Sequence, residues 1–93
     1  MAHNGTPLTE FGKFAHQLWQ DRGLVAKQVA FGMNSSITHL NDTCHGRRSP
    51  TPYFIRNMCR ALHLSADETV HLNTAAARQV GYTLELYIKR RVI

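Results

Sequence analysis

The sequence lacks the features of several large classes of protein. Its 93 residues contain no apolar run near the ~18 residues that a membrane span requires. Its start has no cationic region followed by an apolar stretch, so we expect no secretory signal. Two cysteines, Cys44 and Cys59, are too few for a disulfide framework. We therefore expect a cytoplasmic protein with reduced thiols and no membrane partner.

Patterns for catalysis and metal binding are also scarce. No glycine-rich phosphate loop is present. Cys44 is followed by His45, and Cys59 by His63 four residues later, but the two pairs belong to different segments and lack the tight spacing of zinc ligands. Cys44 has no carboxylate from a separate element that could orient a histidine base. We expect no metal, no cofactor and no enzymatic activity.

Acidic residues are nearly missing from the middle of the chain. The whole sequence has eleven Lys and Arg against six Asp and Glu, a net charge of +5. Between residues 22 and 66 the only acid is Asp42. The bases of that segment are Arg22, Lys27, Arg47, Arg48, Arg56 and Arg60. This excess favours a surface that faces a polyanion, although ordinary solvated side chains would give the same charge.

Apolar spacing predicts five helices and an all-α fold. The first is expected to have Thr6 as its cap and Pro7 as its first residue, and to end at Gly23. The second is predicted over residues 24–31, with Phe31 tucked under the first helix or exposed to a partner. The third helix is predicted to start at Ser35-Ser36, with a serine hydroxyl as its cap, and to run to about Cys44. The fourth is predicted to start at Thr51-Pro52, as cap and first residue, and to include Leu62. The fifth is predicted from a capping box at Ser65 to Val80, with Val70, Ala76, Ala77 and Val80 as packing positions.

The two ends of the chain differ from this helical middle. Residues 1–6 are small and polar and suggest a loose arm. Residues 82–93 are expected to be a short strand or extended tail, because strand-forming residues alternate there. The alternating residues are Tyr82, Leu84, Leu86 and Ile88. We expect them to pack across the two-fold axis of a homodimer, or else to fold back on their own domain.

The segment from Gly23 to Pro52 has a helix-turn-helix pattern, in which two short helices are joined by a tight turn and followed by glycine and two arginines. The residues that carry a wider likeness are Phe11-Gly12-Lys13-Phe14, Asp21-Arg22-Gly23-Leu24, Lys27, Val29-Ala30, Met33-Asn34, Ser36, Leu40 and His45-Gly46-Arg47-Arg48. In these residues the chain resembles the lambda-repressor/Cro-like (XRE) family, from about Leu8 to Tyr82. The resemblance implies a compact five-helix DNA-binding domain, here residues 7–81.

The resemblance also implies how such a domain would meet double-stranded DNA, with its third helix in the major groove. Base contacts are then expected from Ile37, Thr38, Asn41 and Asp42. Contacts with the DNA backbone are expected from Lys27, Ser36, His39, His45, Arg47 and Arg48. By its chemistry Asn41 suits adenine, the methyl groups of Ile37 and Thr38 suit thymine, and Asp42 suits the amino group of cytosine.

Two functions follow as hypotheses. The first is a sequence-specific transcriptional regulator, expected to be a repressor, that acts on nucleoid DNA as a homodimer. Compact members of the family without a ligand domain are typical of phages and other mobile elements, or of antitoxins. The alternative is a protein-interaction module on the same scaffold, such as an antitoxin, adaptor or anti-repressor. Phe31 and Ile37 favour this alternative, because exposed apolar residues mark partner surfaces.

Overall fold

Five helices account for the secondary structure of residues 7–80, which are the residues that the computed structural model describes. They are α1 (Glu10–Asp21), α2 (Ala26–Gly32), α3 (Ile37–Cys44), α4 (Pro52–Leu62) and α5 (Ala66–Val80). No strand occurs in that range, so the predicted all-α class is confirmed for it. The expected arm 1–6 and the expected extended segment with Tyr82, Leu84, Leu86 and Ile88 lie outside the described residues.

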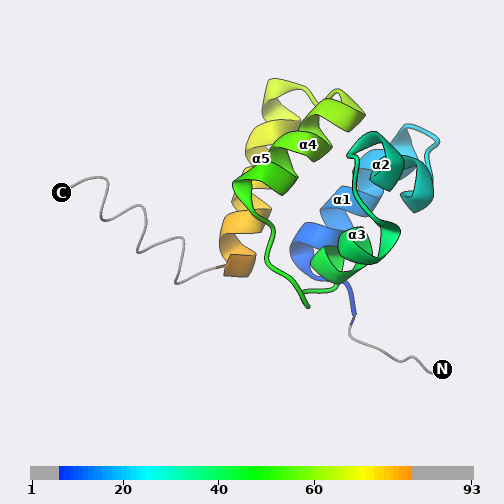
Figure 1. Ribbon diagram of the computed structural model, residues 1–93. Helices are drawn as coiled ribbons and strands as arrows, with labels where there is room; N and C mark the ends of the chain where they lie inside the picture. Colours follow the sequence, from blue (N-terminus) through cyan, green and yellow to red (C-terminus); the bar gives the residue numbers. More distant parts are fainter. Residues whose placement is uncertain (1–6, 81–93) are drawn as a thin grey trace.

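Helix α1 is the element around which the others are arranged. It contacts α2, α3 and α5, while α4 contacts α2 and α5. In Figure 1, α4 and α5 lie on one side of α1, and α2 and α3 lie on the other. No helix within residues 7–80 combines the length and the apolar character needed to cross a membrane.

Short polar residues begin three helices where the sequence predicts them. The Ser36 hydroxyl accepts a hydrogen bond from the His39 N–H at 3.0 Å, and α3 follows. The Thr51 hydroxyl accepts from the Phe54 N–H at 3.1 Å, with Pro52 as the first residue of α4. At Ser65 the predicted capping box is confirmed by reciprocal bonds with Glu68 of 2.9 and 3.1 Å. Each cap satisfies N–H groups that have no partner inside the helix.

The predicted starts of the first two helices are wrong. Helix α1 begins at Glu10 rather than Pro7, because the Thr9 hydroxyl accepts from the Gly12 N–H at 3.0 Å. Helix α2 begins at Ala26 rather than residue 24. Val25 has no hydroxyl at this start, and its own N–H instead donates to the Gln28 side-chain oxygen at 2.9 Å.

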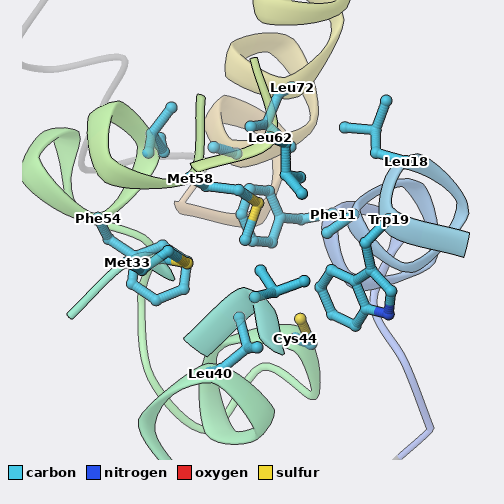
Figure 2. Close-up of a cluster of buried hydrophobic side chains, with 14 of the residues drawn as sticks. Phe11, Leu18, Trp19, Met33, Leu40, Cys44, Phe54, Met58, Leu62 and Leu72 are labelled. Carbon is cyan, nitrogen blue, oxygen red and sulfur yellow. The ribbon is translucent and has the colours of Figure 1, made fainter. Parts of the chain in front are cut away.

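One apolar core joins all five helices. Figure 2 shows Phe11 of α1 together with Leu40 of α3, Met58 of α4 and Leu72 of α5, all fully buried. The Phe11 and Phe54 rings lie 6.3 Å apart in a tilted arrangement. The packing positions predicted on α5 are only partly right. Ala76 is buried, but Val70 is 61% exposed, and the helix anchors itself through Leu72 and Ala75, two positions that the prediction omitted.

Candidate nucleic-acid interface

Helix α3 is anchored along one side and open along the other. Leu40, Thr43 and Cys44 have no exposed surface. The Thr43 hydroxyl donates to the His39 carbonyl at 2.9 Å, which explains how a polar residue fits a buried position. Ile37 and Thr38 at the start of the helix are exposed, Ile37 at 43%. The helix therefore presents its first turn outward.

Contacts at both ends hold α3 in this orientation. The turn before it passes through Asn34 with a φ of 58°, a left-handed conformation that asparagine tolerates well. At its other end the Thr9 N–H donates to the Cys44 carbonyl at 3.0 Å. The side-chain nitrogen of Gln79 donates to the Thr43 carbonyl at 3.2 Å. Segments from before α1 and from the end of α5 thus fix the last turn of α3.

The four expected base-contact residues all lie on α3, in two different settings. Ile37 and Thr38 are exposed, whereas Asn41 and Asp42 are half-buried. Asp42 is also in an ion pair, since its Oδ1 lies 2.9 Å from Nε of Arg47. The structure therefore joins an expected base contact to an expected phosphate contact. The sequence places these two residues five apart, across the end of a helix, so helical spacing gave no signal for the pair.

The residues expected to contact the DNA backbone also divide into exposed and half-buried ones. Lys27, Ser36, Arg47 and Arg48 are exposed, whereas His39 and His45 are half-buried. The His39 ring lies 5.3 Å from the ring of Phe54, so its apolar face packs against α4. Lys27 is on α2, and the two arginines follow α3 in the loop before α4. The exposed cations of this expected set thus belong to the segments directly before and after α3.

Not every base of the middle segment is available to a polyanion. Arg22 donates to the carbonyls of Leu62 and Leu18 at 2.8 and 3.0 Å and pairs with Glu68 at 2.7 Å, so it joins α1 to the start of α5. Hydrogen bonds from the Ser65 N–H and from Arg22 lower the pKa of Glu68. We interpret Arg22 as a structural residue.

Of the two settings that the sequence left open for Phe31, tucked under the first helix or exposed, the structure shows the exposed one. The Phe31 side chain is 88% exposed and does not tuck under α1. Helix α2 turns Val29 and Ala30 into the core, and a Cβ on Gly32 would lie 3.3 Å from the Ala61 side chain of α4. Phe31 therefore points away from the core. Val25, at the start of the same helix, is 59% exposed, so α2 carries an exposed apolar surface.

The thiol of Cys44 is poorly suited to nucleophilic chemistry. Burial raises the pKa of this thiol to about 12, so at neutral pH it carries its proton almost entirely. Cys44 lies in the core beside Leu40 and Trp19 (Figure 2). Over residues 7–80 no three His, Cys, Asp or Glu side chains are grouped so as to hold a metal ion.

The candidate interface thus consists of the open side of α3, Lys27 before it, and Arg47 and Arg48 after it. The exposed apolar surface of α2 adjoins this interface in the chain, because α2 is the helix directly before α3.

Comparisons with protein-family models, curated proteins and solved structures find no match for the chain.

Proposed function

We propose that the chain is a sequence-specific DNA-binding transcriptional regulator, a repressor, whose α2 and α3 act as a helix-turn-helix in a lambda-repressor-like domain. One observation carries the proposal. Helix α3 is buried along one side at Leu40, Thr43 and Cys44, and it exposes Ile37 and Thr38 at its first turn. A helix anchored in this way can enter the major groove, which is about 12 Å wide, without unfolding its own core.

The side chains around α3 supply the two kinds of contact that such a complex needs. Exposed Lys27, Arg47 and Arg48 suit phosphates, which provide affinity but no sequence information. The methyl groups of Ile37 and Thr38 suit the thymine methyl group, and the Asn41 amide suits adenine. Sequence preference would come from this second group.

The proposal includes a homodimer that binds a two-fold operator. Two copies of α3 would occupy successive major grooves about 34 Å apart. The residues proposed to join the copies are Tyr82, Leu84, Leu86 and Ile88, whose alternation gives one apolar side to an extended segment. Sedimentation of the double variant Leu84→Glu, Leu86→Glu should show monomers, whereas Thr83→Glu, on the opposite side of the alternation, should leave the dimer intact. Dimers of both variants would contradict this assignment.

Selection of bound duplexes from a random DNA pool tests the function directly. The expected result is an enriched palindrome with half-sites one helical turn apart. Two exposed lysines make a matched pair for this test: Lys27 on α2, and Lys13 on α1, which lines a groove between α1 and α5. Lys27→Ala should weaken binding to the selected duplex and Lys13→Ala should not. No enrichment at low salt would contradict the proposal.

The exposure of Phe31 favours a second candidate, a protein-interaction module such as an antitoxin or adaptor. Phe31 and Val25 leave apolar surface open to solvent, which is common at partner sites. Recovery of one stoichiometric protein partner, lost in Phe31→Ser, together with no DNA enrichment, would select this function over the first.

A further inference from the structure

Arg47 is held by Asp42 through both its side chain and its backbone. Its Nε lies 2.9 Å from Oδ1 of Asp42, and its backbone N–H donates to the Asp42 carbonyl, also at 2.9 Å. The chain reaches this position through Gly46, whose φ of +81° is a conformation that glycine adopts readily. The turn after α3 therefore brings Arg47 back beside the helix.

The geometry leaves the outer end of Arg47 free for another ligand. A guanidinium carries five N–H donors, and the Asp42 carboxylate engages the one on Nε. Within residues 7–80 the two terminal nitrogens of Arg47 have no further ion pair or hydrogen bond. The Arg47 side chain is 48% exposed and that of Asp42 is 29% exposed. The Arg47 side chain is thus more exposed to solvent than the Asp42 carboxylate that orients it.

A carboxylate at this place needs an explanation, because Asp42 is the only acid between residues 22 and 66. A free carboxylate would repel the phosphates that Lys27, Arg47 and Arg48 are proposed to bind. Pairing with Arg47 places a positive charge beside that carboxylate and so offsets part of the repulsion. The pair also restricts an otherwise flexible arginine before any ligand arrives, which reduces the rotamer entropy lost on binding.

We propose that Asp42 is a positioning residue that orients Arg47 toward a DNA phosphate, and that it does not read a base. The inference rests on the proposed function and reassigns one of the four residues expected to contact bases. Base preference then comes from Ile37, Thr38 and Asn41. Asp42 contributes to affinity alone, and only through Arg47.

Two substitutions separate this role from the general effect of charge. Asp42→Asn and Asp42→Ala remove the same negative charge, but only asparagine keeps an oxygen that can accept from Nε of Arg47. We expect the alanine variant to bind the selected duplex about threefold to tenfold more weakly than the asparagine variant, the range for one modest hydrogen bond. In an Arg47→Ala background the two should bind equally. Both should keep the wild-type preference at every base pair of the operator.

The experiment measures dissociation constants for these variants on the selected duplex and on single-base substitutions of it. Circular dichroism at the same temperature verifies that each variant is folded. If wild type binds no duplex, the proposed function fails, and this inference fails with it. If wild type binds but either Asp42 variant loses preference at one G·C pair, Asp42 reads a base and only this inference is overturned. An Asn-to-Ala ratio of one, or a ratio that persists in the Arg47→Ala background, also overturns it alone.

Discussion

Gly12 of α1 lies against the backbone carbonyl of Cys44, the last residue of α3. A Cβ placed on Gly12 would be 2.0 Å from that carbonyl oxygen, well inside the closest approach that real atoms show. The same oxygen accepts the Thr9 N–H at 3.0 Å. The contact lets α1 and α3 approach more closely than a side chain on Gly12 would permit.

We predict that Gly12→Ala strongly destabilises the protein. Alanine gains about 1 kcal/mol of helix propensity over glycine. The new methyl group would collide with backbone, which cannot rotate away as a flexible side chain can. A clash with backbone lies at the upper end of the about 1–3 kcal/mol that overpacking costs, or above it. After the gain of about 1 kcal/mol in helix propensity, we expect a net loss of about 2 kcal/mol in the free energy of unfolding, measured by urea denaturation.

Gly32→Ala is the matched control for this prediction. It is also a helical glycine, but its new Cβ would meet only the Ala61 side chain, at 3.3 Å. The gain in propensity and the tight contact should roughly cancel, leaving a change within about 1 kcal/mol. Similar stabilities for the Gly12 and Gly32 variants would show that the approach of α1 to α3 is not a constraint on the fold.

A second prediction concerns the reading of bases by Asn41. Asn41→Ala should relax the preference at one A·T pair, at a cost of about 1–3 kcal/mol on the preferred duplex and little on a duplex changed at that pair. Arg48→Ala should weaken binding to all duplexes alike, because a phosphate contact carries no sequence information. Binding titrations on a panel of single-base variants give both results. Equal losses on every duplex for Asn41→Ala would show that Asn41 is not a base contact.

The helices were predictable from sequence because their signals are local. The apolar spacing around Phe11 and Leu18, the serine before α3 and the Thr51-Pro52 start of α4 all depend on residues within a few turns of one another. The start of α1 was mispredicted because two local signals compete there, Thr6-Pro7 and the Thr9 hydroxyl that accepts from the Gly12 N–H. The Thr9 hydroxyl also lies 2.6 Å from the Gln79 side-chain oxygen and 3.2 Å from the Cys44 carbonyl, and no local pattern reveals these contacts across 70 and 35 residues.

In the candidate site, too, some features follow from local spacing and others depend on the folded chain. The exposure of α3 at Ile37 follows from the anchor positions, but the sequence left open whether Phe31 tucks under α1 or is exposed, because α2 is too short for its apolar spacing to decide. The Asp42–Arg47 pair did not follow from any spacing rule. It depends on the left-handed turn at Gly46, which brings the loop back beside α3.

The third prediction is that Phe31 contributes nothing to folding. Its side chain is 88% exposed, so Phe31→Ser should change the free energy of unfolding by less than about 0.5 kcal/mol. Affinity for the selected duplex should also be unchanged, because neither base contacts nor phosphate contacts are assigned to this residue. Thermal unfolding and DNA titration measure the two quantities. Loss of regulation in cells with both quantities intact would identify the exposed surface of α2 as a partner site.

The fourth prediction is a loss of stability in mild acid through His16. Burial lowers the pKa of this histidine below its ordinary value of 6.5, and the nearby His45 lowers it further. The Nε2 atom of His16 is buried without a hydrogen-bond partner among residues 7–80, and the ring lies 4.3 Å from that of Trp19. The folded state keeps His16 neutral, so it loses stability relative to the unfolded chain once the unfolded chain binds a proton at this residue.

The direction of the pH effect follows from this difference. Well above pH 6.5 His16 is neutral in both the folded and the unfolded state, so it does not make the free energy of unfolding depend on pH. As the pH falls below 6.5, the unfolded state binds the proton more readily, so the free energy of unfolding decreases, by less than about 1.4 kcal/mol per pH unit for one proton. His16→Phe should flatten this decrease between pH 7.5 and 5.5 in urea denaturation. His16→Gln should flatten it too, with lower stability throughout, because it places an amide beside Trp19. An unchanged slope in both variants would assign the acid sensitivity to other groups.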